Sequence, residues 1–194
     1  NQKYFRKIDN IYFNNSSNKK NLSFVFSIAK ILKLNLKTVI NTANKFKGLN
    51  YRQQIIYNSK KLLIINDSKS TSFSSTVPLL ESYQNIYWIL GGLAKKGDKL
   101  SLNKNYISNI KAYVYGKDRN FFISSLPNQI SYKSSPTLKN ILKNLNNDIR
   151  KDNTKKVILF SPCAASFDQF KNFEERGNFF NNIIILMLKK LKYE

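Results

Sequence analysis

Carboxyl, ammonium and hydroxyl groups follow one apolar run of strand length closely enough to form a ligand site. The run KLLI at 61–64 leads directly into INDSKSTSFSST, which carries Asp67, Lys69 and Thr71 at alternate positions with serines between them. These side chains supply donors, acceptors and both signs of charge. Two interpretations are open: a loop that only joins a strand to a helix, or a ligand site at a strand end.

Two other apolar runs end in residues of similar chemical interest. ILGGLAKKGD contains Gly91, Gly92 and Lys95, and SPCAASFDQFKNFEERG contains Ser166. Paired glycines let a backbone approach a ligand closely, although after a strand they more often form a plain turn. Ser166 precedes a helix-like stretch. It either caps that helix or offers its hydroxyl and the following N–H groups to a carboxylate.

The elements that must position these residues alternate between strands and helices. Short continuous apolar runs, typical of strands buried on both faces, predict strands at 61–66, 86–90, 111–115 and 156–160. Apolar spacing predicts helices over 136–149, with Ser135 as N-cap and Pro136 as first residue, and over about 175–191. This alternation predicts an α/β domain with a Rossmann-like, mostly parallel sheet. Ligands bind such sheets outside the carboxyl ends of the strands.

The first quarter of the chain has a different character. Residues 21–34 are apolar around most of their circumference and predict a buried helix, and 36–46 predict an amphipathic one. The GLN at 48–50 is the predicted boundary. We therefore expect two regions, 1–49 as a helical tail from a preceding domain and 50–194 as the Rossmann-like domain.

Composition excludes several classes of site. The 194 residues contain no histidine and one cysteine, Cys163, which excludes a disulfide framework and a cysteine metal site. The longest apolar run, at 183–188, is far shorter than the roughly 20 residues that span a bilayer. No phosphate-binding G-x-x-x-x-G-K-[ST] motif occurs. We expect a soluble, cytoplasmic protein without membrane contact. The chain does not begin with Met, which suggests a fragment.

The net charge of +22 has two explanations. A basic nucleic-acid-binding α/β module without catalytic activity would have such a charge, because neutralising phosphates releases counterions. However, Lys is spread along the whole chain beside abundant Asn and Ile, as A/T-rich codons favour. A nucleic-acid site would instead cluster its charge on one face or in a tail.

Three stretches, in their order and spacing, match a known family. NDSKSTS, ILGGLAKKGD and LFSPCAASFDQFKNFEERGNFF resemble the D-glutamate-adding branch of the Mur ligase family, and FKGLNYR at 46–52 resembles its junction between central and C-terminal domains. The resemblance covers about residues 15–182, and the third stretch is the most specific. It implies that 1–49 end a central ATPase domain and that the rest is the C-terminal domain.

The resemblance implies a function in peptidoglycan synthesis. Members of this branch join D-glutamate to UDP-N-acetylmuramoyl-L-alanine, with ATP activating the acceptor's carboxylate as an acyl phosphate. The phosphate-binding loop, the Mg²⁺ ligands and a carbamylated lysine of the family would lie upstream. This chain would then hold no catalytic residue or metal ligand, and would be inactive alone. The complete ligase would act as a monomer.

Position by position, the resemblance implies two sets of contacts. ATP would contact Asn21 near the adenine, Arg52 near the phosphates, Asp67 at the ribose, and Lys69. D-glutamate would contact Thr71, Lys95, Ser166, Phe167 and Phe173. The residue types suit a dicarboxylate, which needs a cation, hydroxyls and N–H donors. Tyr51 stands where the family usually has histidine, a departure on the adenine side.

Overall fold

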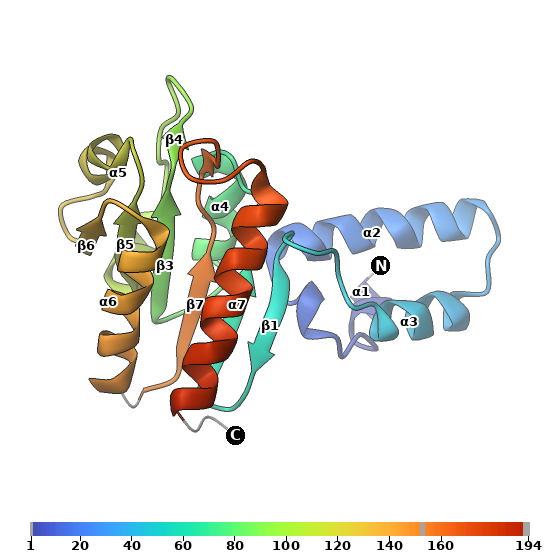
Figure 1. The fold of residues 1–194 in the computed structure, drawn as a ribbon. Helices are drawn as coiled ribbons and strands as arrows, with labels where there is room; N and C mark the ends of the chain where they lie inside the picture. The colour runs from blue at the N-terminus through green and yellow to red at the C-terminus, as the bar shows by residue number, and fades with distance from the viewer. Residues whose placement is uncertain (1, 152–153, 192–194) are drawn as a thin grey trace.

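A computed structural model describes residues 2–151 and 154–191 of the chain. Its main feature is a six-stranded sheet in the order β1-β2-β7-β3-β5-β6 (Figure 1). The strands are β1 (Gln54–Asn58), β2 (Leu62–Asn66), β3 (Ile86–Gly91), β5 (Ile110–Tyr115), β6 (Ser131–Ser135) and β7 (Lys156–Phe160). Two shorter strands, β4 (Leu93–Ala94) and β8 (Ala164–Ala165), form a separate antiparallel pair beyond the sheet.

All strands of the six-stranded sheet except β1 run parallel, so the predicted mostly parallel α/β fold is confirmed. The four predicted strands are β2, β3, β5 and β7. All residues of β2, β3 and β7 are buried, as expected for strands covered on both faces. The two edge strands, β1 and β6, were not predicted. Their residues are half-buried or exposed, so they lack the apolar run that reveals a central strand.

Helices cover both faces of the sheet (Figure 1). One face packs against α4 (Phe73–Leu80), α5 (Arg119–Ser125) and the 3-10 helix η2 (Lys104–Asn109). The other packs against α6 (Leu138–Lys151) and α7 (Phe173–Leu191). Alternate residues of each strand enter the two cores: Leu63 and Ile65 face the first, Leu62 and Ile64 the second. The sheet is therefore the middle layer of three.

The predicted start of α6 is wrong by two residues. Ser135 belongs to strand β6, and the helix begins at Leu138. Thr137 takes the capping position, since its hydroxyl accepts the N–H of Asn140 at 3.2 Å and its carbonyl accepts the N–H of Ile141 at 3.1 Å. Pairing of Ser135 with Tyr115 of β5 holds the serine in extended conformation, which a sequence pattern does not reveal.

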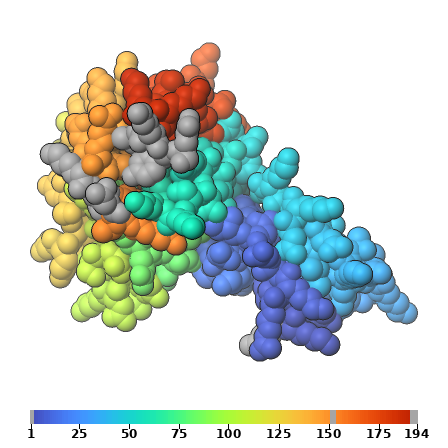
Figure 2. Space-filling view, turned by 90° about the horizontal axis from the view of Figure 1, so that it is seen from below, coloured from blue at the N-terminus to red at the C-terminus, as the bar shows by residue number. Residues whose placement is uncertain are grey.

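Residues 2–49 form a helical region that projects from the sheet (Figures 1 and 2). It consists of α1 (Gln2–Phe5), the 3-10 helix η1 (Ile11–Phe13), α2 (Ser16–Ile31) and α3 (Leu36–Lys45). A third, smaller core joins Phe13, Leu22, Phe26, Ile40 and Ala43. This separate core supports the predicted boundary near residue 49, which stays a prediction.

The prediction that 21–34 form a buried helix is wrong. Only one side of α2 is buried, and the other exposes Phe24, Val25, Ile28 and Ile31, the last to 79%. Too few elements surround α2 to cover an apolar surface that extends around the helix. Within the residues that the structure describes, no helix is both long and apolar enough to cross a membrane.

Candidate functional site

The carboxyl ends of β2 and β7 lie side by side and bring a carboxylate and a hydroxyl together. Asn66 pairs with Phe160 at the last position of both strands, and the N–H of Asp67 donates to the Phe160 carbonyl at 2.7 Å. Ser161 Oγ donates to Asp67 Oδ2 at 2.9 Å, and the Gln53 N–H donates to Oδ1 at 3.1 Å. Ser161, which follows β7, and Gln53, which precedes β1, thus hold the carboxyl group of Asp67 in place at the end of β2.

Burial dominates the electrostatics of Asp67, which is only 6% exposed. Removal from water raises the pKa of the Asp67 carboxyl to about 7, although the hydrogen bonds from Ser161 and Gln53 and the positive charge of Arg52 act in the opposite direction. This carboxyl therefore changes its charge near neutral pH. Arg52 itself is exposed and faces solvent at the same edge.

Lys69 lies against the first residue of α7. Its side-chain ammonium is 4.0 Å from the centre of the Phe173 ring, and its backbone N–H donates to the Tyr51 carbonyl at 3.0 Å. Ser68 Oγ donates to the Phe173 carbonyl at 2.8 Å. The structure therefore brings together Asp67, Lys69 and Phe173, with Thr71 exposed two residues further along the same loop.

Tyr51 packs on α7 at a glycine. Its hydroxyl donates to Asn178 Oδ1 at 2.7 Å, and its ring meets that of Phe173 edge-on at 6.3 Å. A Cβ at Gly177 would lie 2.2 Å from Tyr51 Cδ1. The tyrosine at position 51, where the resembled family usually has the smaller histidine, thus fits only because residue 177 is a glycine.

Arg176, which was not predicted as a site residue, connects the loop after β2 to strand β8. Its side chain is almost fully buried at 1% exposure. Nη2 donates to the Ser68 carbonyl at 2.6 Å and to the Ala164 carbonyl at 3.0 Å, and Nε donates to Ser68 Oγ at 3.1 Å. A sequence signal existed: Arg176, Phe180 and Ile184 recur every four residues, and all three are buried on one face of α7.

The ribbon of β4 and β8 joins the segments that follow β3 and β7, with Lys95 and Ser166 at its opposite ends. Leu93 pairs with Ala165 and Ala94 with Ala164, so in this antiparallel register Lys95 continues beside Cys163 and Ser166 beside Gly92. Lys95 is exposed, whereas Ser166 is 3% exposed. The Lys95 side chain is therefore accessible to an anion in solution, whereas the Ser166 side chain is enclosed by the protein.

Gly91 and Gly92 accommodate protein backbone and not a ligand. A Cβ at Gly91 would lie 1.9 Å from the Tyr115 carbonyl oxygen, and one at Gly92 would lie 2.5 Å from that of Ala165. Both glycines have positive φ, of 132° and 130°. The two glycines let the end of β3 approach β5 and β8 closely, so protein backbone fills the space beside Gly91 and Gly92.

Ser166 is not the N-cap of the following helix. Its carbonyl accepts the N–H groups of Gln169 and Phe170 at 3.1 and 2.9 Å, within a turn. The helix α7 begins at Phe173, where Asn172 Oδ1 accepts the Glu175 N–H at 2.7 Å. Phe167 lies between these features and is 70% exposed. The alternative role of Ser166, in ligand contact, stays a prediction.

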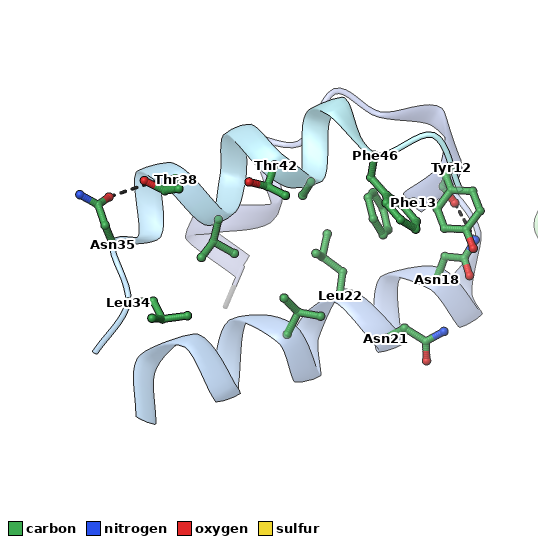
Figure 3. Close-up of a pocket in the computed structure, with 13 residues that line it drawn as sticks. Tyr12, Phe13, Asn18, Asn21, Leu22, Leu34, Asn35, Thr38, Thr42 and Phe46 are labelled. Carbon is green, nitrogen blue, oxygen red and sulfur yellow. Dashed lines mark hydrogen bonds between the residues drawn. The ribbon is translucent and has the colours of Figure 1, made fainter. Parts of the chain in front are cut away.

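Asn21 lies apart from the other predicted ATP contacts. It is exposed on α2, at the edge of a cavity of about 640 Å³ between α2 and α3 (Figure 3). Tyr12 lines the same cavity, and burial followed by the negative charge of Asp67 raises the pKa of its hydroxyl. The Tyr12 hydroxyl therefore responds to the charge of Asp67. Sequence reasoning did not identify this residue.

The aromatic side chains of β3 and β5, which could stack on bases if they were exposed, are enclosed. Tyr87, Trp88, Tyr113 and Tyr115 are at most 7% exposed, within β3 and β5. They pack the core, as expected of strand residues. Among the described residues, no group of three His, Cys, Asp or Glu side chains comes together to hold a metal ion.

Known proteins place the chain among the Mur ligases. It is 36% identical to a ligase of Wolbachia sp. subsp. Brugia malayi over 167 residues, 86% of this chain and 34% of that protein. It is also 36% identical to one of Rickettsia bellii, over 91% of this chain and 39% of that protein. Both are UDP-N-acetylmuramoylalanine–D-glutamate ligases, so the resemblance to the D-glutamate-adding branch is confirmed. The chain spans little more than a third of these relatives' length. No family model matches it.

The fold also occurs in solved Mur ligase structures. The MurF ligase of Thermotoga maritima in complex with ADP matches 92% of this chain and 39% of its own, with a TM-score of 0.57 and 14% identity. MurF from Acinetobacter baumannii matches with a TM-score of 0.55 and 15% identity. At such identities the likeness concerns the fold alone. It covers both the helical region and the α/β unit, because it extends over most of the chain.

Proposed function

We propose that this chain supplies the D-glutamate site and part of the ATP site of a ligase that joins D-glutamate to UDP-N-acetylmuramoyl-L-alanine. The observation that carries the proposal is the arrangement at one edge of the sheet. Asp67, Lys69 and Phe173 come together there, and the antiparallel β4–β8 ribbon, which carries Lys95 and Ser166 at its opposite ends, joins the segments that follow β3 and β7. The sequence relatives support the reaction type.

The residues on the nucleotide side suit ATP. Each Asp67 oxygen accepts one protein hydrogen bond, which leaves a lone pair for a ribose hydroxyl. Arg52 and Lys69 add positive charge beside it. Asn21 and Tyr12 stand on the helical region and would complete the adenine side. Bound ATP would supply the phosphoryl group that activates the acceptor's carboxylate as an acyl phosphate.

The residues on the other side suit D-glutamate. Lys95 would pair with one carboxylate, and Thr71 would donate its hydroxyl to it, since charge-assisted bonds are the strongest available. Ser166 and the N–H groups of Phe167 and Phe173 would hold the second carboxylate. Held in this way, the amine of D-glutamate would be oriented towards the activated carbonyl, and positioning would account for most of this chain's contribution.

The remaining partners follow from the reaction. Mg²⁺ would accompany ATP, with ligands outside the residues described here, and the ligase would act in the cytoplasm as a monomer. A basic nucleic-acid-binding module is the competing proposal. It gains no support from Tyr87, Trp88, Tyr113 and Tyr115, which are buried in β3 and β5.

Titration of the 194-residue chain by NMR tests the proposal. D-glutamate should shift the amide signals of Thr71, Lys95, Ser166 and Phe173, and ATP those of Arg52, Asp67 and Lys69. L-glutamate is the matched control and should bind at least tenfold more weakly. Equal shifts from both enantiomers, or shifts scattered over other faces, would refute the assignment of the D-glutamate site.

A further inference from the structure

A row of side-chain hydroxyls leads from Asp67 to the surface. Ser161 Oγ is 2.9 Å from Asp67 Oδ2, and Thr76 Oγ1 is 2.6 Å from Ser161 Oγ. Ser70 Oγ then lies 2.7 Å from Thr76 Oγ1 and 2.8 Å from Ser75 Oγ. Thr76 and Ser161 are fully buried, Ser70 is 4% exposed, and Ser75 is exposed. The row thus connects the end of β2, the end of β7 and the first turn of α4.

One proton per hydroxyl fixes the direction of donation along the row. When Asp67 is ionised it only accepts, so Ser161 must donate to it. Thr76 must then donate to Ser161, and Ser70 to Thr76. When Asp67 is protonated, Oδ1 still accepts the Gln53 N–H, which favours the proton on Oδ2. Oδ2 then donates to Ser161, and the whole row reverses. The Cys163 thiol, which donates to Thr76 Oγ1 at 3.0 Å, fits both directions because the threonine oxygen has two lone pairs.

At the outer end of the row, at Ser75, the two directions of donation differ in one hydrogen bond to the backbone, the bond from Ser75 to the Ser72 carbonyl. Ser75 Oγ donates to the Ser72 carbonyl at 2.7 Å and also contacts Ser70 Oγ. Its single proton serves only one of them. With Asp67 neutral, Ser70 donates to Ser75, which keeps its bond to Ser72. With Asp67 ionised, Ser70 donates to Thr76, so its oxygen becomes an acceptor for Ser75 that competes with the Ser72 carbonyl.

We propose that Thr76 is a positioning residue that couples the charge of Asp67 to the hydrogen bonding of the Ser72 carbonyl, directly after Thr71. Its consequence for the reaction rests on the proposed function, in which Asp67 holds the nucleotide and Thr71 the D-glutamate. Binding of ATP at Asp67 would then adjust the loop that receives the second substrate.

The surroundings of Asp67 allow the switch near neutral pH. Burial raises its pKa to about 7. The charged and titratable groups that face it are Arg52, Tyr12 and Cys163, and burial also raises the pKa of both the tyrosine hydroxyl and the thiol. Those two groups therefore stay neutral while Asp67 titrates.

NMR on the 194-residue chain measures the coupling directly. The Asp67 side-chain carboxyl carbon should titrate with a midpoint near 7. The amide signals of Thr71, Phe73 and Ser75 should shift with the same midpoint. Absence of that common midpoint in the unmodified chain would overturn the proposal.

Two substitutions at one position separate the hydroxyl from the packing. Thr76→Val keeps the shape and removes the hydroxyl, so the Asp67 midpoint should rise by about 0.5 to 1 pH unit and the loop signals should stop following it. Thr76→Ser keeps the hydroxyl and should preserve both. Ser70→Ala should break the row further out and uncouple the loop alone. Identical titrations in the Val and Ser variants would refute the coupling.

ATP distinguishes this proposal from the proposed function. Ribose hydroxyls that donate to Asp67 should lower its midpoint. If ATP leaves the midpoint unchanged while the loop still titrates with Asp67, the nucleotide role fails and the coupling stands. If ATP lowers the midpoint but the loop does not respond, the coupling fails and the nucleotide role stands.

Discussion

At the scale of single residues, two adjacent lysines have different proposed roles. Lys95 follows β4 directly and is proposed to pair with a D-glutamate carboxylate, while Lys96 is an exposed neighbour in the same turn. Lys95→Ala should weaken D-glutamate binding by about 10- to 100-fold, the value of one charge-assisted bond. Lys96→Ala, which removes the same charge, should change it less than about threefold. Titration of each variant with D-glutamate gives both dissociation constants.

Equal losses in the two variants would contradict the role of Lys95. They would show that general positive charge, and not one ammonium group, attracts the dicarboxylate. Measurement at two salt concentrations supports the distinction, because screening weakens a diffuse attraction more than a close pair.

Sequence predicted the polar residues at the strand ends better than their supports. Asp67, Lys69 and Thr71 stand out because charged and hydroxyl side chains follow an apolar run. Arg176 and Thr76 lie inside helices, and their contacts span 108 and 85 positions along the chain. No local pattern encodes such contacts. The sequence left the role of Gly91 and Gly92 open between a turn and a ligand contact, and only the fold shows that Tyr115 and Ala165 take the space beside them.

At the scale of elements, Asp148 connects α6 to the sheet through ion pairs and a hydrogen bond. It accepts from Lys111 of β5 at 2.8 Å, Lys133 of β6 at 2.7 Å and the Tyr113 hydroxyl at 2.6 Å. Burial alone would raise the pKa of Asp148, but these donors outweigh it and lower the pKa to about 2. The carboxylate thus stabilises the fold above the ordinary pKa of 3.8, and this contribution is lost as the pH falls towards 2.

Asp148→Asn should therefore lower the free energy of unfolding by about 1 kcal/mol at pH 6, since both lysines are partly exposed. Urea unfolding at pH 6 and at pH 2 measures the loss, which should disappear at the lower pH. Asp9→Asn, at an exposed site, is the control and should have little effect at either pH. A loss that stays constant with pH would exclude the ionic contribution.

The contact between Tyr51 and α7 should appear as coupling between two substitutions. Gly177→Ala should destabilise the chain by about 1 to 3 kcal/mol, because its Cβ would lie 2.2 Å from the Tyr51 ring. In a Tyr51→Ala background the same change should be neutral or stabilise α7 by up to about 1 kcal/mol. Urea unfolding of the four proteins of this double-mutant cycle gives the interaction energy. Additive effects would contradict the contact.

Central elements were easier to predict than edges. β2, β3 and β7 show as apolar runs because helices cover both their faces. SYKSS of β6 is polar because it lies at the edge of the sheet, and it becomes a strand only through its pairing with β5. The start of α6 failed for the same reason, since that pairing extends the strand through Ser135.

At the scale of the whole molecule, the helical region exposes apolar surface that the α/β unit does not cover. Ile28 and Ile31 on α2 are 55% and 79% exposed. Such a surface favours association. The 194-residue chain should show concentration-dependent association in analytical ultracentrifugation, and Ile28→Gln with Ile31→Gln should reduce it. Ile185→Gln, at an exposed position of α7, is the matched control. A chain that remains monomeric at all concentrations would contradict this prediction.

The position of β7 in the sheet constrains how the chain reaches its native state. β7 lies between β2 and β3 but comes last of the six strands in sequence. Before residues 156–160 leave the ribosome, β1 and β2 have no hydrogen bonds to the half formed by β3, β5 and β6. Both halves then expose an unpaired apolar edge, the kind of surface that chaperones recognise. Completion of the sheet therefore has to wait until residues 156–160 follow the five other strands, and it coincides with the delivery of Ser161 to Asp67.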